Sequence, residues 1–217
     1  MSTDVKICGL KTAETLAAAL DAGADYVGLV FFPPSPRHIA DFGLARDLAD
    51  AARGRARIVA LTVDADDALI DRLATDVRPD IFQLHGSETV ARTREIHART
   101  GIQVMKVIKV RDAGDAAAAS AYATPDGPCP MVLFDAKAPP DAVLPGGNGL
   151  AFDWRHLKDV PATMPYMLSG GLTSDNVADA IRLTHARAVD VSSGVERAPG
   201  EKDPGRIRAF IAAAKAI

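Results

Sequence analysis

Residues 165–194 read PYMLSGGLTSDNVADAIRLTHARAVDVSSG, and this stretch contains one complete unit of the fold. The apolar runs at 165–168 and 188–191 have the length and residue types of buried strands. Residues 176–184 between them have the spacing of an amphipathic helix. Each apolar run leads directly into a glycine-containing loop. The stretch therefore predicts two parallel strands joined by a helix.

The same alternation extends along the chain in both directions. Strand-like runs lie at 5–8, 26–31, 57–63, 81–84, 104–110, 131–135, 165–168 and 188–191. Helical stretches lie at 12–22, 43–52, 66–75, 89–100, 113–122, 176–184 and 204–216, with a short one near 154–158. Eight pairs in 217 residues give a mean unit of about 27 residues, which suffices for a (β/α)8 TIM barrel. We predict an α/β protein with a single domain over residues 1–217.

An open, doubly wound sheet is the alternative with this alternation. A nucleotide-binding sheet of that kind carries G-x-G-x-x-G in its first strand-to-helix turn. Here the turn reads Cys8-Gly9-Leu10-Lys11-Thr12, and no phosphate-binding G-x-x-x-x-G-K-[ST] loop occurs elsewhere. The number of units and the missing motif favour the barrel.

Composition limits the classes of function. Hydrophobic residues make up 48% and charged residues 24%, as in ordinary globular proteins. The net charge is −3 without a basic cluster, which argues against nucleic acid and anionic membranes as partners. No window reaches about 18 apolar residues, the N-terminus does not resemble a signal peptide, and there are only two cysteines. We expect a cytoplasmic monomer or homodimer that acts on a small molecule.

The loops after the last two strands predict a phosphate site. Gly171 lies in one, and Ser192, Ser193 and Gly194 lie in the other. This is the usual phosphate position in such barrels, because glycine lets backbone N–H groups approach an anion. The alternative is that these glycines only permit tight turns.

Cys8 and Asp135 are candidates for acid–base chemistry, because each ends a predicted strand. In the barrel the two strands face each other across the mouth, so one side chain could act as acid and the other as base. Lys6 lies on the same strand face as Cys8, and we expect its charge to lower the pKa of the thiol. Cys8 could also be a small core residue. Asp135 could instead cap the next loop or pair with Lys137.

Other polar residues near the strand ends are less decisive. Arg37, in a proline-rich loop, suits bidentate binding of a substrate carboxylate, although it could be a surface charge. His85 could be a ligand or a base, but its surroundings lack metal-ligand spacing, so we predict no metal site. Asp64 and Asp66 look like caps of the third helix. Asp190 and Glu196 are ambiguous.

In these motifs and their order the chain resembles the phosphoribosylanthranilate isomerase family of tryptophan biosynthesis. The resemblance rests on Val5-Lys6-Ile7-Cys8-Gly9-Leu10, Gly23-Ala24-Asp25-Tyr26-Val27-Gly28-Leu29, Phe32-Pro33-Pro34-Ser35-Pro36-Arg37, Gln83-Leu84-His85-Gly86, Phe134-Asp135, Gly146-Gly147-Asn148-Gly149, Leu168-Ser169-Gly170-Gly171-Leu172, Val189-Asp190-Val191-Ser192-Ser193-Gly194-Val195-Glu196 and Pro199-Gly200-Glu201-Lys202-Asp203. One departure is Asn148, where the family commonly has Thr or Ser.

The resemblance implies a (β/α)8 barrel that catalyses an Amadori rearrangement of N-(5′-phosphoribosyl)anthranilate without cofactor or metal. It implies that Cys8 is the general base, with a pKa near or below the free thiol value of about 8.5. It implies that Asp135 is the general acid, which has to be protonated near neutral pH. It also implies that Arg37 binds the anthranilate carboxylate. Gly171, Ser192, Ser193 and Gly194 then lie in the phosphate loops.

Four other functions compete with this interpretation. The histidine-pathway Amadori isomerase usually has Asp at the end of the first strand, where this chain has Cys8. A ribulose-phosphate epimerase needs metal ligands. A barrel that only binds phosphorylated metabolites would need no proton donor and acceptor at its mouth. A thiol hydrolase would need a histidine beside Cys8.

Overall fold

A computed structural model of the protein describes residues 3–124, 126–137, 146 and 151–217. In these residues eight parallel strands form a closed barrel, and the last strand pairs with the first. The strands are β1 (Asp4–Cys8), β2 (Tyr26–Phe31), β3 (Arg57–Thr62), β4 (Ile81–Leu84), β5 (Gln103–Val110), β6 (Val132–Ala136), β7 (Tyr166–Leu168) and β8 (Ala188–Val191). The predicted barrel is thus confirmed, and the open sheet is excluded.

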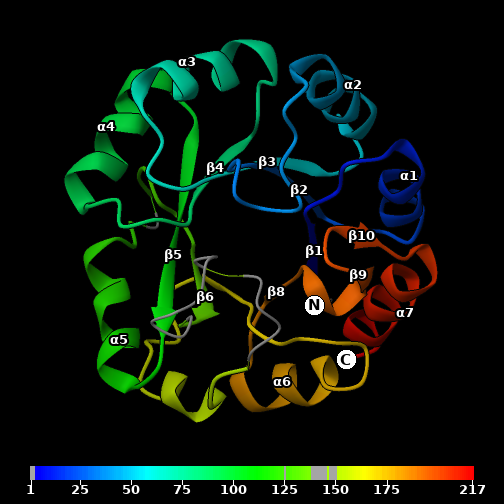
Figure 1. The fold of residues 1–217 in the computed structure, drawn as a ribbon. Helices are drawn as coiled ribbons and strands as arrows, with labels where there is room; N and C mark the ends of the chain where they lie inside the picture. The colour runs from blue at the N-terminus through cyan, green and yellow to red at the C-terminus, as the bar shows by residue number, and fades with distance from the viewer. Residues whose placement is uncertain (1–2, 125, 138–145, 147–150) are drawn as a thin grey trace.

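Helices surround the strands in a ring (Figure 1). They are α1 (Ala13–Asp21), α2 (Phe42–Ala52), α3 (Asp67–Asp76), α4 (Val90–Thr100), α5 (Ala113–Ala117), α6 (Val177–Thr184) and α7 (Pro204–Lys215), with 3-10 helices η1 (Ala118–Ala121), η2 (Trp154–Leu157) and η3 (Ser193–Val195). Two predictions need correction. The helix expected at 113–122 is divided into α5 and η1, and the short helix near 154–158 is the 3-10 helix η2.

Side-chain caps mark most helix starts. Thr12 accepts a hydrogen bond from the Thr15 N–H at the start of α1, and Asp66 caps α3 as predicted. Asp64, the other expected cap of α3, has a different role. Its φ is +48°, and its carboxylate accepts hydrogen bonds from the N–H and hydroxyl of Ser87. Asp64 therefore joins the loops after β3 and β4.

The core has an inner and an outer part. Large side chains that include Tyr26, Ile81, Met105 and Leu133 fill the inside of the barrel. A larger cluster packs the outer side of the strands against the helices. Because strand side chains alternate between two faces, the buried residues two positions after the inner cluster, such as Asp135 after Leu133, point toward the barrel mouth.

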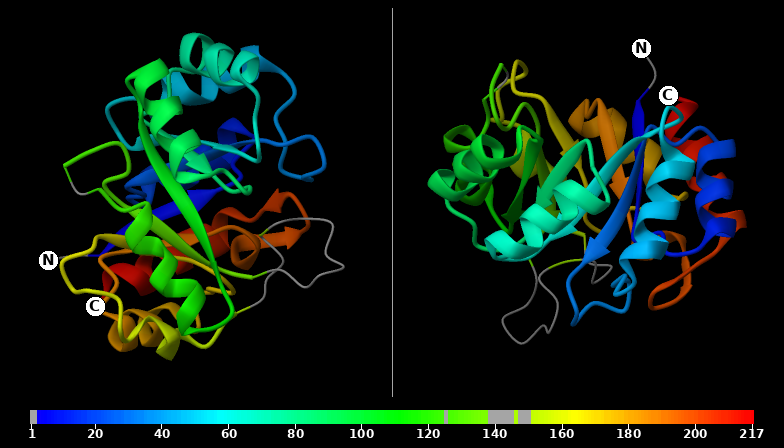
Figure 2. Two further views of the ribbon diagram at one scale, coloured as in Figure 1. Left: turned by 90° about the vertical axis from the view of Figure 1, so that its left-hand side faces the viewer. Right: turned by 90° about the horizontal axis from the view of Figure 1, so that it is seen from above.

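A short antiparallel hairpin follows η3. It consists of β9 (Glu196–Ala198) and β10 (Glu201–Lys202), which the sequence analysis did not predict. In the right-hand view of Figure 2 this hairpin and the loop after β2 lie at one end of the barrel, and both chain termini lie at the other end. The hairpin therefore belongs to the face on which the strands end.

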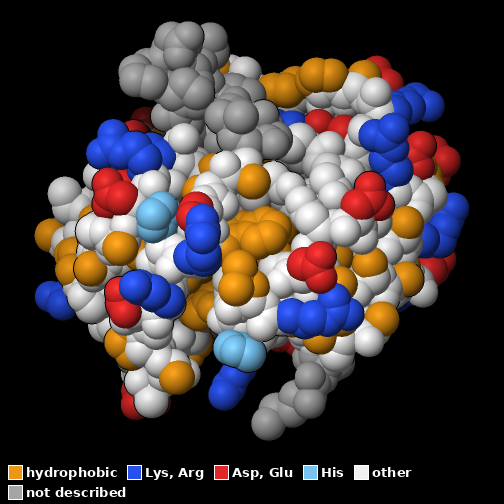
Figure 3. Space-filling model, turned by 90° about the horizontal axis from the view of Figure 1, so that it is seen from below, with side chains coloured by type: hydrophobic (Ala, Val, Ile, Leu, Met, Phe, Trp, Pro, Cys, Tyr) orange, Lys and Arg blue, Asp and Glu red, His pale blue; other side chains and the backbone are white. Residues whose placement is uncertain are grey.

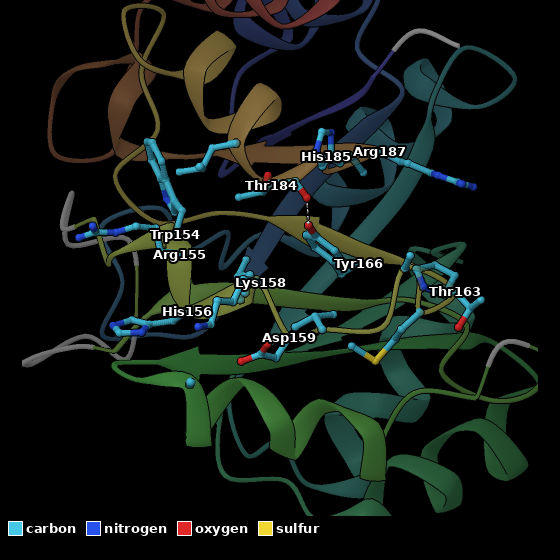
Figure 4. A pocket seen from close by; sticks show the side chains of 18 of the residues that line it. Trp154, Arg155, His156, Lys158, Asp159, Thr163, Tyr166, Thr184, His185 and Arg187 are labelled. Carbon is cyan, nitrogen blue, oxygen red and sulfur yellow. Dashed lines mark hydrogen bonds between the residues drawn. The ribbon is translucent and has the colours of Figure 1, made fainter.

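The side of the molecule near α6 contains a cavity. There η2 contacts both α5 and α6, and hydrophobic side chains gather at the centre of this side (Figure 3). A cavity of about 1320 Å³ is lined by residues that include Trp154, Leu157, Met164 and Tyr166 (Figure 4). Its lining also includes Asp4 and Ala188 at the amino ends of β1 and β8, so it lies away from the barrel mouth. Within the described ranges no helix is long and apolar enough to cross a membrane.

Candidate active site

Three chemically competent side chains lie where strands end. Cys8 is the last residue of β1, Asp135 lies near the end of β6, and His85 follows β4 directly. All three are buried. Because the strands are parallel and the barrel is closed, their carboxyl ends surround one opening. β7 and β8 lie between the strands of Cys8 and Asp135, as the predicted facing arrangement requires.

The Cys8 thiol and the Lys6 ammonium meet over a glycine. A Cβ added to Gly28 would lie 2.9 Å from Cys8 Sγ and 3.2 Å from Lys6 Nζ. Both β1 side chains therefore occupy the space that a side chain on β2 would take. Lys6 is fully buried, and its Nζ donates to Asp190 Oδ1 on β8 at 2.8 Å. Asp190, which was ambiguous in the sequence, thus neutralises Lys6 inside the barrel, and its Oδ2 accepts from the Ser169 hydroxyl at 3.2 Å.

Burial raises the pKa of the Cys8 thiol above its ordinary value, and this effect outweighs the neighbouring charges. Lys6 acts in the predicted direction and lowers the pKa, Asp190 raises it, and Lys202 lowers it. The expectation of a thiol with a pKa near or below its free value is therefore wrong. Desolvation at the end of an apolar strand destabilises the thiolate more than an ammonium that is already paired with a carboxylate stabilises it.

Asp135 has two neighbours of different kinds. Its Oδ1 accepts from the N–H of Ala136 at 2.9 Å, and its Oδ2 lies 3.3 Å from Nε2 of His85. The predicted alternative, a pair with Lys137, does not form, because Lys137 contacts Asp115. Gly146 packs against this pair, since a Cβ there would lie 2.7 Å from Asp135 Oδ2. Gly147, Asn148 and Gly149 lie outside the described residues.

The two loops predicted to bind phosphate contact each other. Gly171 follows β7 with a φ of +67°, and a Cβ on Gly194 would overlap the carbonyl oxygen of Leu172. Glycine is thus required at both positions, at one by its φ and at the other by the close approach of the loops. The preceding Gly170 lies beside the acid candidate, since its Cβ would be 3.3 Å from Asp135 Oδ1.

The two serines of the last loop have different surroundings. The Ser192 hydroxyl donates to the carbonyl oxygen of Cys8 at 3.2 Å and accepts from Lys202 Nζ at 3.2 Å. Its single proton is therefore used within the protein. The Ser193 hydroxyl makes no hydrogen bond to any described residue and is only partly buried. Of the two hydroxyls, the one on Ser193 has its donor available for a ligand.

Arg37 is buried in the loop after β2, which corrects the alternative of a surface charge. Its Nε and Nη2 each donate to Glu196 at 2.8 Å, one to each carboxylate oxygen. Its side chain crosses the residue after Cys8, since a Cβ on Gly9 would lie 2.8 Å from Arg37 Cδ. The guanidinium is thus oriented by Glu196 in a planar, bidentate pair beside the end of β1.

The sequence analysis gave Lys202 no role and left the role of Glu196 open. Lys202 Nζ donates to Glu196 Oε1 at 2.7 Å and to the carbonyl oxygen of Ser192 at 2.9 Å. Arg37 and Lys202 outweigh the effect of burial and lower the pKa of Glu196. The only signal was in 196–202, where two charged residues stand on each side of an Ala-Pro-Gly segment, and this pattern does not identify the partners of these charges.

Two alternatives can be examined against this geometry. In the described ranges no histidine hydrogen-bonds to Cys8, and His85 faces Asp135 instead, so the arrangement of a thiol hydrolase does not form. Likewise, the described residues contain no cluster of three or more His, Cys, Asp or Glu side chains that could hold a metal ion. Cys129 is buried just before the amino end of β6, and its thiol donates to the Met131 carbonyl oxygen at 3.5 Å.

Comparison with known families gives a consistent result. Residues 5–213 match the family described as N-(5′-phosphoribosyl)anthranilate (PRA) isomerase. The chain is 58% identical over 216 residues to N-(5′-phosphoribosyl)anthranilate isomerase of Rhodopseudomonas palustris strain BisA53, which covers 100% of this chain and 97% of the relative. It is 57% identical to the enzyme of the same name from Bradyrhizobium diazoefficiens, with 100% and 95% covered.

Solved structures agree with the fold. The crystal structure of phosphoribosyl anthranilate isomerase from Thermotoga maritima has a TM-score of 0.86 and 36% identity, and covers 99% of this chain and 100% of that one. A second structure, of such an isomerase in complex with reduced 1-(o-carboxyphenylamino)-1-deoxyribulose 5-phosphate, has a TM-score of 0.81 and 32% identity, with the same coverage.

Proposed function

The chain belongs to the N-(5′-phosphoribosyl)anthranilate isomerase family and is an isomerase of tryptophan biosynthesis, and we propose that Cys8 and Asp135 perform its chemistry. The reaction is the Amadori rearrangement of N-(5′-phosphoribosyl)anthranilate to 1-(2-carboxyphenylamino)-1-deoxyribulose 5-phosphate. The observation that carries the proposal is the burial of one thiol and one carboxyl group at the carboxyl ends of β1 and β6, with the glycine loops of β7 and β8 between them.

The rearrangement needs an acid and a base at different atoms of one substrate. Asp135, protonated, transfers its proton to the furanose ring oxygen, and the ring opens to a Schiff base. Cys8, as the thiolate, then removes the proton from C2′, and the electron pair of that C–H bond forms the enolamine. Tautomerisation of the enolamine gives the ketone product. The net reaction moves hydrogen within the substrate and needs no oxidant or reductant.

The substrate's two anionic groups match two parts of the mouth. The loops with Gly171, Ser193 and Gly194 offer backbone N–H groups and a hydroxyl to the phosphate. Ser192 holds the second loop in place through hydrogen bonds with Lys202 and the Cys8 carbonyl oxygen. Arg37, held flat by Glu196, binds the anthranilate carboxylate. The ribose then lies between Cys8 and Asp135.

The raised pKa of Cys8 determines both the population of the thiolate and its strength as a base. At neutral pH the free thiol is mostly protonated, because burial raises its pKa. Lys6 and Lys202 favour the small thiolate population. A thiolate with a high pKa is a stronger base than one with a low pKa, so this population suits removal of a weakly acidic C–H proton.

The protein's surroundings and assembly are part of the same proposal. A phosphorylated metabolite as substrate and a chain without a basic cluster fit a cytoplasmic enzyme that binds neither nucleic acid nor membrane. A monomer or a homodimer suffices, because one barrel carries all the site residues named here. Sedimentation equilibrium measures which of the two forms in solution.

A fluorescence assay that follows the loss of phosphoribosylanthranilate tests the base directly. Cys8→Ala should lower kcat by about 10²–10⁴-fold, the usual contribution of one acid–base group. Cys129→Ala is the matched control, because it removes the other buried thiol away from the mouth, and it should keep the wild-type kcat. Wild-type turnover in Cys8→Ala would refute the assignment of the base.

A further inference from the structure

The β9–β10 hairpin is built against the loop that carries Arg37. Gly200, in the turn of the hairpin, has a φ of +79°, and a Cβ there would lie 2.5 Å from the carbonyl oxygen of Pro36. The hairpin thus packs directly on the proline-rich segment, and only a glycine fits at the contact. The consequence is that the two charged side chains which point inward from the hairpin, Glu196 and Lys202, reach the site of Arg37.

Lys202 connects Glu196 to Ser192, in the loop after β8, through one nitrogen. Its Nζ is within 2.7 Å of Glu196 Oε1, 2.9 Å of the Ser192 carbonyl oxygen and 3.2 Å of the Ser192 hydroxyl. Its side chain is only 1% exposed. An ammonium has three donors, and here each has an acceptor within the protein. Lys202 therefore contributes position and charge but has no donor left for a ligand.

The charges of this cluster do not cancel. Arg37 and Lys202 carry two positive charges, and Glu196 carries one negative charge, so the three side chains together carry +1. Without Lys202, the bidentate pair of Arg37 and Glu196 would be neutral. Because the cluster is buried, its charge acts on a ligand with little screening by water.

We propose that Lys202 is a positioning residue that determines specificity: it shares Glu196 with Arg37, and so leaves this part of the mouth with the positive charge that selects a substrate bearing a carboxylate. The proposal rests on the proposed role of Arg37. Lys202 acts through Arg37 and does not touch the substrate. It distinguishes the anthranilate conjugate from phosphorylated aminoaldoses whose aromatic ring lacks a carboxylate.

The ionisation of Lys202 gives the proposal a measurable signature. Burial lowers the pKa of Lys202 to about 8; Glu196 opposes this effect, Arg37 adds to it, and the Cys8 thiol raises the pKa slightly. On α7, Arg206 donates to the Glu196 backbone carbonyl. Above pH 8 the ammonium loses its proton, so the cluster loses its net charge, and affinity for a carboxylate should fall.

Binding of an unreactive ligand isolates this effect from catalysis. The probe is reduced 1-(o-carboxyphenylamino)-1-deoxyribulose 5-phosphate, measured by calorimetry on the full chain over a pH range around 8. A second probe is the corresponding phenylamino compound, which lacks the carboxylate. For the wild type, the Kd of the first probe should rise by about tenfold between one pH unit below and one unit above the pKa of Lys202. The Kd of the second probe should stay nearly constant.

Three variants distinguish the possible outcomes. Lys202→Met should weaken binding of the carboxylate probe by at least about tenfold at neutral pH and abolish the change near pH 8. Lys202→Arg keeps a charge that does not titrate, so it should bind tightly on both sides of pH 8. Lys106→Met is the matched control, because Lys106 is an equally buried ammonium paired with Glu88 at 2.7 Å, and it should keep the wild-type pH profile.

Several results would overturn the proposal. Equal losses for both probes in Lys202→Met would show that Lys202 only supports the phosphate loop. An unchanged Kd in Lys202→Met would remove any role in binding. If Lys202→Met does not fold, Lys202→Arg decides the question. A wild-type pH profile in Lys202→Arg would show that ionisation of Lys202 does not control binding of the carboxylate probe. Arg37→Met tests the proposed role of Arg37 independently of Lys202. Wild-type affinity of this variant for the carboxylate probe would refute the role of Arg37 itself.

Discussion

Nε2 of His85 and Oδ2 of Asp135 lie 3.3 Å apart at the mouth of the barrel. Nδ1 of the same imidazole faces the Gln83 side-chain amide at 3.4 Å. The carboxyl group proposed to donate a proton therefore has an ionisable neighbour on one side and a backbone N–H on the other. The sequence left the role of His85 open, and the structure places its ring beside the Asp135 carboxyl group.

Replacing Asp135 with Asn tests the acid. Asn keeps the size of the side chain and an oxygen for the Ala136 N–H, but it cannot donate a proton as an acid. We expect kcat to fall by about 10²–10⁴-fold with little change in KM, measured by loss of phosphoribosylanthranilate fluorescence. Asp115→Asn, at the surface pair with Lys137, should leave kcat unchanged. A kcat within a factor of a few of wild type in Asp135→Asn would exclude the carboxyl group as the acid.

The pH dependence of Cys8 alkylation measures the raised pKa. Because only the thiolate reacts, the rate should still be rising at pH 9, and Lys6→Met should move its midpoint to higher pH, since the ammonium lowers the pKa of the thiol. Lys6→Met also leaves Asp190 unpaired, which costs about 3–5 kcal/mol for a buried pair. The double variant Lys6→Met/Asp190→Asn removes that penalty. An alkylation midpoint below pH 8 in the wild type would contradict the raised pKa.

Gly28 should tolerate no side chain. A Cβ there would meet Cys8 Sγ at 2.9 Å and Lys6 Nζ at 3.2 Å, so Gly28→Ala overfills the mouth. We expect a loss of about 1–3 kcal/mol in the free energy of unfolding and a lower kcat, from urea denaturation and from the activity assay. Combining it with Cys8→Ala should restore part of the stability, because one of the overlapping atoms is removed. Additive losses in the double variant would show that the thiol is not the obstacle.

Arg37→Ala should change binding more than chemistry. In the proposed role the guanidinium binds a substrate carboxylate that does not react, so KM should rise by more than kcat falls. Loss of a hydrogen bond to a charged group corresponds to about 1.5–3 kcal/mol, or roughly 10–150-fold in KM. Steady-state kinetics over a wide substrate range measures both constants. The opposite pattern, an unchanged KM with a large fall in kcat, would place Arg37 in the chemical step.

The elements of the barrel could be predicted from the sequence because each one depends on local patterns. The strands at 26–31, 81–84 and 188–191 have the predicted bounds, since apolar runs of that length have few alternatives. The hairpin after η3 was missed, because its two strands are only three and two residues long and have no apolar alternation. Nothing local distinguishes such a segment from a loop.

The positions of the candidate site residues in the fold could be predicted from the sequence, but the ion pairs and hydrogen bonds between them could not. Strand ends pointed to Cys8 and Asp135, and glycines pointed to the loops after β7 and β8. The pairing of Arg37 with Glu196 spans 159 residues, and the pairing of Lys6 with Asp190 spans 184. Such contacts are created by closure of the barrel and have no spacing that a sequence could reveal. The direction of the Cys8 pKa shift was misjudged mainly because burial of the thiol raises its pKa, and also because Asp190 lies beside Lys6 and opposes its effect.

The ion pair between Lys6 and Asp190 has a consequence for synthesis of the protein on the ribosome. The chain buries Lys6 in its first strand, but the carboxylate that neutralises it belongs to the eighth. A nascent chain that has not yet released β8 would have to bury an uncompensated ammonium, which is strongly unfavourable. We therefore expect the first strand to reach its buried position only at the end of translation, and the Cys8 thiol to gain its native environment after nearly all of the polypeptide has emerged.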